Sequence, residues 1–200
     1  HAAIGDEGGG GKMSNGGFTL GGVTAKSLGI VMISTSQRPI LPSTVDRTTA
    51  IPGRNGAWDF GADVSPRALN LDCALIQSDA TSLQIAVEGL ARLLVDRYGK
   101  PRTLELTLDL RPDRHFQVRY SGSLDIDRII GLGRFTIPLV AFDPYAYGDD
   151  RIVEQTITAS PTIINVPSDG DILTSPVIEL TNIGSTTINQ FTIKNEYQIE

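Results

Sequence analysis

The sequence predicts a mainly β protein with one α-helix. Three observations carry this prediction: strict apolar–polar alternation in two segments, a single helical stripe of leucines, and short β-type runs between Pro, Gly, Asp and Ser residues over the last quarter of the chain. The 200 residues allow one generous domain, or one domain with a smaller second one. No apolar run approaches the ~18 residues that cross a membrane.

The first residues are not typical of a natural domain. The run Gly8–Gly11 looks like an added linker, so we exclude residues 1–12 from the fold and expect the natural start at Met13. The segment also lacks the apolar core of a signal peptide. Beyond it, Phe18–Leu20, a Gly-Gly turn and Leu28–Ser34 have the composition of strands.

The stretch 38–61, RPILPSTVDRTTAIPGRNGAWDFG, predicts a long arm. Long loops without structure of their own are usually functional or disordered, and disordered segments are poor in aromatic residues. Arg38, Arg54, Trp58 and Phe60 are therefore our candidates for contacts with a neighbouring molecule. The alternative is an ordinary long hairpin folded back on its own sheet.

The segment Arg67–Ile76 alternates, with Leu69, Leu71, Cys73 and Leu75 on the predicted core face. The one cysteine is thus expected to be a buried small side chain, and it cannot form an internal disulfide.

One helix follows. Thr81 and Gln84 have the spacing of a capping box, and the apolar stripe Leu83, Val87, Leu90, Leu94 and Tyr98 predicts a helix that ends before Gly99. We expect this stripe to pack on a sheet.

The second half of the domain reads as antiparallel strands. Thr103–Leu110 places four leucines inward, Arg111–Arg114 is predicted to turn the chain, and His115–Leu124 returns. After a loop at 125–133, Phe135–Phe142 is an apolar strand in which Pro138 indicates an edge or a bulge.

Beyond residue 151 the character changes. Four short β-type runs are expected there: Ile152–Thr158, Ile163–Val166, Val177–Leu180 and Thr187–Ile193. About forty-five residues make a thin core alone, so this part leans on the first or is the beginning of a larger domain.

The residues offer little for catalysis. His115 lacks a nucleophile elbow and is expected to be a strand residue, and no glycine pattern matches a phosphate-binding loop. The pairs Asp125/Asp127 and Asp149/Asp150 lack the ligand run of a calcium loop. We predict no catalytic residue, no metal, no cofactor and no enzyme.

The charge is unevenly spread. The net charge is −6, of which residues 152–200 carry most, with Lys194 against six carboxylates. A dedicated nucleic-acid binder would show a basic patch, so this distribution argues against that class.

Taken in order, several motifs resemble the distal tail proteins of siphophages. They are FTLGGVTAKSLGI, RPILPS, IPGRNGAWDFG, RALNLDC, the single helix, the hairpin around RPDR and FTIPLVAFDPYAYG, which together cover about 18–148.

The resemblance implies a tail-tube-like β-sandwich or barrel domain over residues 13–151 that forms a hexameric ring, with arm 38–61 belting a neighbouring subunit. It implies a tail tube protein on one side of the ring, a tail-associated tip protein on the other, receptor-binding proteins as further partners, and DNA passing through without specific binding or membrane contact. Residues 152–200 resemble the start of a galectin-like C-terminal β-sandwich, here short and incomplete. The place of action would be the virion tail tip, after assembly in the host cytoplasm.

Two alternatives stay open from the sequence. The nearer one is a tube or hub protein of a contractile tail or bacteriocin particle. The other is a carbohydrate-binding or carbohydrate-cleaving β protein.

Overall fold

A computed structural model describes residues 16–33, 36, 39–129, 132–167 and 170–196. Residues 1–12 and Arg38, which figure among the sequence predictions, lie outside this range. The chain divides into two compact units, His1–Asp150 and Arg151–Glu200.

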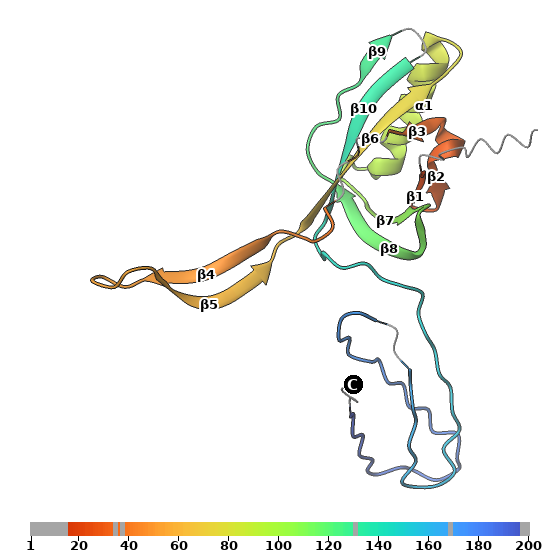
Figure 1. The fold of residues 1–200 in the computed structure, drawn as a ribbon. Coiled ribbons are helices and arrows are strands. Elements are labelled where there is room, and N and C mark those ends of the chain that lie inside the picture. The colour runs from red at the N-terminus through yellow and green to blue at the C-terminus, as the bar shows by residue number, and fades with distance from the viewer. Residues whose placement is uncertain (1–15, 34–35, 37–38, 130–131, 168–169, 197–200) are drawn as a thin grey trace, which may run out of the picture. The chain divides into compact units, whose positions relative to one another are not determined.

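The first unit contains one α-helix, one 3-10 helix and ten strands in its described residues (Figure 1). In chain order they are β1 (Phe18–Leu20), β2 (Val23–Thr24), η1 (Ala25–Leu28), β3 (Ile30–Met32), β4 (Thr44–Ala50), β5 (Ala57–Val64), β6 (Arg67–Ile76), α1 (Ala80–Leu94), β7 (Thr103–Leu108), β8 (Arg111–Tyr120), β9 (Asp127–Ile129) and β10 (Leu132–Ala141).

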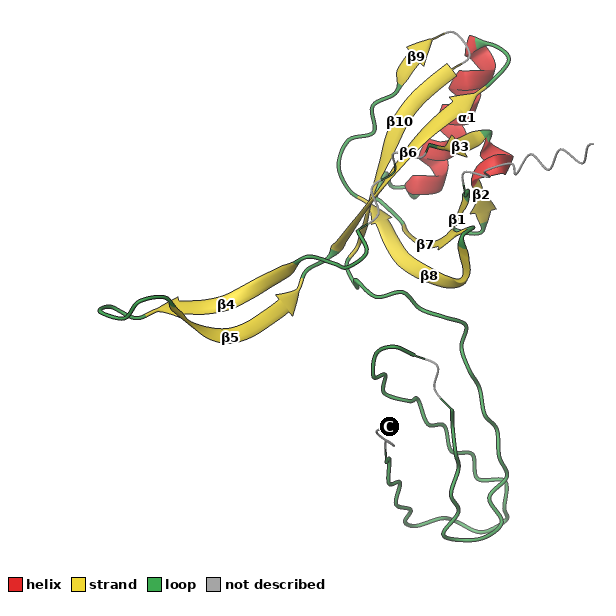
Figure 2. Ribbon diagram, viewed as in Figure 1, coloured by secondary structure: helices red, strands yellow, loops and turns green. Residues whose placement is uncertain are grey.

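Eight of the strands form one curled antiparallel sheet, in the order β2-β1-β7-β8-β10-β6-β3, with β9 paired to β10 (Figure 2). The longest pairing in this sheet is between β10 and β6, which runs in unbroken register from Leu132 opposite Ile76 to Ala141 opposite Arg67. The mainly β class with one α-helix is therefore confirmed. The expected turn at Gly21 and Gly22 is also present, between β1 and β2.

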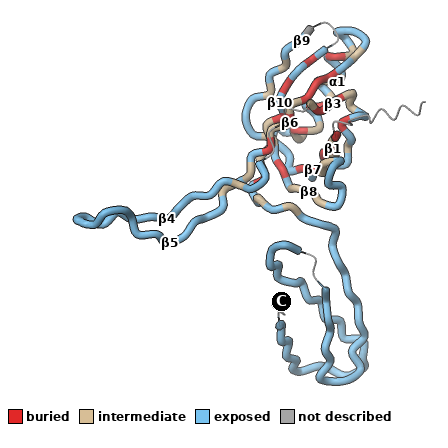
Figure 3. Tube along the Cα trace, viewed as in Figure 1, coloured by how far each residue is buried: buried red, intermediate tan, exposed pale blue. Residues whose placement is uncertain are grey.

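The core lies between the sheet and α1. The alternation predicted for β6 holds, since Leu69, Leu71, Cys73 and Leu75 are all almost fully buried. Leu83, Leu90 and Leu94 of α1 pack into the same cluster, which Figure 3 shows as the buried segments of the first unit. Burying each such side chain contributes roughly 1.5–3 kcal/mol, so this cluster stabilises the unit.

The ends of the helix differ from the sequence prediction. Asp79 is the N-cap, because its carboxylate accepts the Ser82 amide at 2.9 Å, and Thr81 lies inside the first turn. The helix ends at Leu94, not at Tyr98. Asp96 accepts the amides of Tyr98 and Lys100, both at 2.8 Å, and so holds the chain in a tight turn that leaves Tyr98 exposed.

The turn predicted at Arg111–Arg114 lies elsewhere. The chain reverses at Asp109 and Leu110, and the RPDR residues begin β8. Asp109 exchanges two hydrogen bonds with Gly17, one through its backbone amide and one through its carboxylate. This pairing fixes the reversal there, so Leu110 is exposed instead of pointing inward.

Pro138 sits within β10, in the middle of the sheet order. Its carbonyl accepts the Ser121 amide, just beyond the last residue of β8, Tyr120. The N–H and C=O groups of one residue in an antiparallel strand face the same neighbouring strand. The N–H that proline lacks would therefore face β8, at the position where β8 stops pairing with β10. Pro138 thus occupies a local edge and leaves the β6 ladder intact.

In the second unit, the structure assigns neither helix nor strand to the described residues of 151–196, and every one of them is exposed. The four β-type runs predicted there are thus not formed as strands in this chain. A segment of this size buries too little apolar surface to fix a sheet alone.

Candidate functional site

The candidate site is the hairpin of β4 and β5. These two strands pair with each other and with no strand of the main sheet, and Figure 1 shows them extending from the sheet as an arm. All fifteen of their residues are exposed. The segment has structure of its own, which corrects the expectation of an unstructured loop, and it is not folded back on the sheet.

The tip of the arm is a tight turn that its sequence dictates. The Arg54 amide donates to the Ile51 carbonyl at 3.1 Å, with Pro52 and Gly53 between them. Proline fixes φ at the first central position, and Gly53 takes φ +82°, which an L side chain would resist. Pro52 and Gly53 therefore close the hairpin, and the tip has a defined shape.

Two of the predicted contact residues meet near the tip. The Arg54 guanidinium lies 4.7 Å from the centre of the Trp58 ring, and Trp58 is still 48% exposed. Phe60 is 64% exposed further along β5. Arg54 thus covers only part of the indole, and the apolar surface that stays exposed is available for a partner.

The middle of the arm is irregular. The β4–β5 register shifts between Asp46 and Thr48, and Arg47 makes an ion pair with Asp63 of the facing strand. Both side chains are more than half exposed, so the pair contributes little to stability. The bulge increases the local twist of the ribbon.

The base of the arm is held by Arg67, which sequence reasoning missed. Its guanidinium donates to the carbonyls of Pro39 and Ile40, the latter at 3.0 Å, and lies 4.9 Å from the centre of the Phe116 ring. Burial lowers the pKa of Arg67. Its partners are backbone carbonyls and a distant ring, so no local sequence pattern marks this residue.

His115 has a structural place in β8. Its backbone amide donates to the Tyr147 carbonyl, and its carbonyl accepts the Tyr147 amide, both at 2.8 Å. The two rings stack with centroids 6.1 Å apart. Tyr147 in turn donates its hydroxyl to Asp143, which raises the pKa of the tyrosine. The FDPYAYG segment is thus fixed against the end of the sheet through His115.

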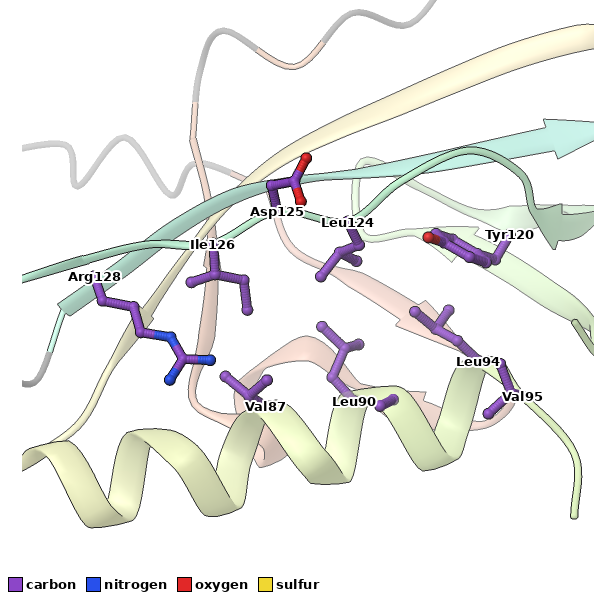
Figure 4. Close-up of a pocket in the computed structure, with 10 residues that line it drawn as sticks. Val87, Leu90, Leu94, Val95, Tyr120, Leu124, Asp125, Ile126 and Arg128 are labelled. Carbon is purple, nitrogen blue, oxygen red and sulfur yellow. The ribbon is translucent and has the colours of Figure 1, made fainter. Parts of the chain in front are cut away.

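A second feature is a groove of about 380 Å³ beside α1. Its floor is Leu90 and Leu94. Its walls are half-exposed or exposed side chains of α1 and the residue after it, of the last residue of β8, of the segment before β9 and of β9 itself (Figure 4). The residues that line it are Val87, Leu90, Ala91, Leu94, Val95, Tyr120, Leu124, Asp125, Ile126 and Arg128. Figure 4 shows that the Asp125 carboxylate points away from α1, whereas the Arg128 guanidinium points toward α1.

The remaining chemistry of the described part is sparse. It holds no group of three His, Cys, Asp or Glu side chains arranged for a metal ion, and none of its helices is both long and apolar enough to cross a membrane. Burial, and then the charge of Asp72, raise the pKa of Cys73 to about 12, so its thiol stays protonated and unreactive.

Comparison with known proteins gives two findings. Residues 25–141 match the family described as the phage tail protein RIFT-related domain. The chain is also similar to the crystal structure of Dit (gp 19.1) from phage SPP1, described as a paradigm of hub adsorption apparatus in phages that infect Gram-positive bacteria.

The structural match has a TM-score of 0.57 at 18% sequence identity, and it covers 67% of this chain and 52% of that one. The chain thus spans about half the length of the SPP1 protein. No curated protein matches the chain in sequence.

Proposed function

The chain belongs to the family of phage tail proteins with a RIFT-related domain, and on that premise we propose that it is a ring-forming subunit at the distal end of a siphophage tail. The family and the shared fold confirm the resemblance to distal tail proteins seen in the sequence. A phage tail protein has its place in the virion.

The ring we propose is a hexamer built by residues 13–151. A tail tube protein would join one side and a tail-associated tip protein the other, with receptor-binding proteins as further partners. DNA would pass through the centre without specific binding or cofactor. Assembly would take place in the host cytoplasm, and the protein would act as a rigid connector without catalytic turnover.

The observation that carries this proposal is the arm. Trp58, Phe60 and Val45 are exposed on this two-stranded hairpin. Their exposure adds little to its stability, and isolated two-stranded hairpins are only marginally stable in water. Burial against a neighbouring subunit would cover these side chains. The hydrogen-bonded turn at the tip and the Arg67 anchor at the base support an arm that is set in place before that contact forms.

Residues 152–200 are, in this proposal, the start of an outward C-terminal β domain. Their described apolar side chains are exposed, and Ile163, Leu173 and Val177 are 75% exposed or more. Additional chain or a partner would be needed to bury them.

Cross-linking of assembled particles tests the ring. The expected ladder of cross-linked species ends at six copies. A ladder that ends at two or three would refute the hexamer, and the purified chain alone serves as the reference for contacts that form without the tail tube.

A further inference from the structure

The two faces of the arm differ in chemistry. Residues directly opposite each other in paired strands share a face, and the register places Thr49 opposite Trp58 and Thr48 opposite Asp59. Successive residues of a strand point to opposite faces. Trp58 and Phe60 therefore share one face of the arm with Thr49, whereas Asp59 and Thr48 lie on the other.

The bulge preserves this division along the arm. One residue of β4, Arg47, stands there opposite two residues of β5. Arg47 is two positions before the residue opposite Trp58, so it shares the Trp58 face. Its ion pair with Asp63 places Asp63 on that face too, and Val45 joins them because it stands opposite Asp63.

We call the side of Val45, Trp58 and Phe60 the aromatic face, and the side of Asp46 and Asp59 the acidic face. On the aromatic face the charges of the Arg47–Asp63 pair cancel. The Arg54 guanidinium lies over the Trp58 ring, so it belongs to the same face. The aromatic face thus combines exposed apolar side chains with one positive charge that no carboxylate of this face balances.

A second surface, on the main sheet, has the opposite charge. The face of β6 and β10 that points away from α1 carries Ile76 opposite Leu132 and, four residues along β6, Asp72 opposite Thr136. Ile76 and Leu132 are exposed, and the Asp72 carboxylate accepts the Thr136 hydroxyl at 2.6 Å. We call this surface the open sheet face.

An acidic hollow of about 500 Å³ lies on the open sheet face. The charged residues that line it are three carboxylates, Asp72, Asp125 and Asp127, and a single cation, Arg134. Asp127 stands directly opposite Arg134 in the β9–β10 pairing. The Asp125 carboxylate points away from α1 (Figure 4) and forms no ion pair with any described residue. The hollow therefore keeps an excess of negative charge.

We propose that the arm binds a second copy of the chain through its aromatic face, with Arg54 directed at Asp125 in the acidic hollow of that copy and the acidic face of the arm left in solvent. The inference rests on the proposed function and deepens it, since it names the face of the arm that makes the contact and the surface of the neighbouring subunit that receives it.

Charge and polarity support this pairing. A guanidinium binds a carboxylate through parallel hydrogen bonds, so Arg54 suits Asp125. The exposed Ile76 and Leu132 share the open sheet face with the hollow and offer apolar surface to Phe60. The acidic face of the arm would instead place Asp59 among the carboxylates of the hollow, which like charges oppose. The aromatic face is therefore the one that fits.

The arm and the open sheet face are different surfaces of one chain, so the contact is heterologous. Heterologous contacts close into a ring when the rotation between copies allows it. The proposed contact is therefore of the type that a ring requires, with each copy giving one arm and receiving another.

Thr48 and Thr49 form a matched pair for testing the face. They are successive exposed residues of β4, the first on the acidic face and the second on the aromatic face. The full chain with Thr48→Cys or Thr49→Cys is treated with a maleimide, once as purified chain and once in particles. In particles Thr49→Cys should react several times more slowly than in the purified chain, whereas Thr48→Cys should react equally in both. The buried, protonated Cys73 does not interfere.

Equal protection of the two positions, or protection of Thr48→Cys alone, would overturn the inference. Assembly that fails with Thr49→Cys and succeeds with Thr48→Cys would support the same face. If neither position is protected and the cross-linking ladder ends at six copies, the ring proposal stands and the contact alone is refuted. Protection of Thr49→Cys alone, with a ladder that ends elsewhere, supports the contact and refutes the hexamer.

Charge reversal tests the receiving surface. Arg54→Glu and Asp125→Arg should each lower the fraction of chain recovered in particles by about tenfold, because each places like charges together. The double variant should recover most of that loss, provided that each variant melts like the parent. Additive losses in the double variant would contradict the proposed pair.

Glu105→Arg is the matched control. Glu105 is an exposed carboxylate of β7 and does not line the hollow, so this variant should assemble like the parent. An equal loss with Glu105→Arg would overturn the assignment of Asp125. If the arm instead bound another tail protein, Asp125→Arg would leave assembly unchanged, and the second copy would be refuted as the partner.

Discussion

The guanidinium of Arg67 lies 4.9 Å from the centre of the Phe116 ring while it donates to the carbonyls of Pro39 and Ile40. One side chain thus joins the first strand residue of β6, a ring on β8 and the chain that enters the arm. The Ser65 amide, which donates to the Ser43 carbonyl at 2.8 Å, closes the base of the hairpin beside it.

We expect Arg67→Met to loosen the base of the arm. Methionine keeps the apolar stem over the ring but removes the donors, and hydrogen bonds from charged groups contribute about 1.5–3 kcal/mol. Hydrogen exchange at the Ser65 amide should accelerate while the β10–β6 ladder stays protected. The matched control is Arg119→Met, since Arg119 covers the Phe142 ring at 4.5 Å without touching the arm. Unchanged exchange at Ser65 would show that Arg67 does not hold the base.

The cap of α1 predicts a pH dependence. The Asp79 carboxylate accepts the Ser82 amide, the Ser78 hydroxyl and the Ser82 hydroxyl, and these bonds lower its pKa. A lowered folded pKa contributes stability that is present above the unfolded value of ~3.9 and is lost as the pH falls through the folded value.

Asp79→Ala should therefore melt below the parent at pH 7, and the difference should shrink as the pH falls below ~3.9. Asp79→Asn is the control, because asparagine caps a helix without titrating in this range. Melting curves of the three proteins from pH 7 to pH 2.5 give the comparison. A difference between Asp79→Ala and the parent that stays constant with pH would contradict the assignment.

DNA passage makes a prediction about the purified chain. A channel wall must let phosphates slide, whereas rows of lysine or arginine would retain them through counterion release. With its net charge of −6, the chain should not retard duplex DNA at physiological salt. Retardation at micromolar protein would speak against the proposed passage.

The sequence could predict what depends on neighbours along the chain. The alternation of β6 and the apolar spacing from Leu83 to Leu94 identified a strand and a helix with their buried faces, because the period alone decides which side chains share a face. The composition of 38–61 singled out that segment, but its two paired strands were not predicted, because the sequence was interpreted there as a long loop without structure of its own.

The element ends and the arm's anchor depend on contacts across the fold. The β7–β8 reversal follows from Asp109 bonding to Gly17, ninety-two positions away, and the end of the helix follows from the carboxylate of Asp96. Arg67 likewise meets its carbonyls and its ring only in the folded sheet, because Pro39, Ile40 and Phe116 lie far from it in the sequence. The strands expected after residue 151 are not formed for a related reason. A β-type pattern forms a sheet only where the sheet can pack on a core, and the described part of this segment has none.

The arm itself gives the last prediction. Trp58→Ala should leave the melting temperature of the monomer unchanged and block assembly into particles, because Trp58 is 48% exposed and packs on Arg54 of its own hairpin and on no core residue. Truncating an aromatic anchor of an interface costs ~2 kcal/mol or more of binding free energy. The measurements are thermal melting and the fraction of chain recovered in particles.

Leu106→Ala is the opposite case and serves as the reference. Leu106 is fully buried in β7, so its truncation leaves a cavity and should lower the free energy of unfolding by ~2–5 kcal/mol. Chain that remains folded should still assemble, because the arm is intact. If Trp58→Ala melted as far below the parent as Leu106→Ala, the indole would belong to the fold of its own unit, and the arm could not be the contact that joins one copy to the next.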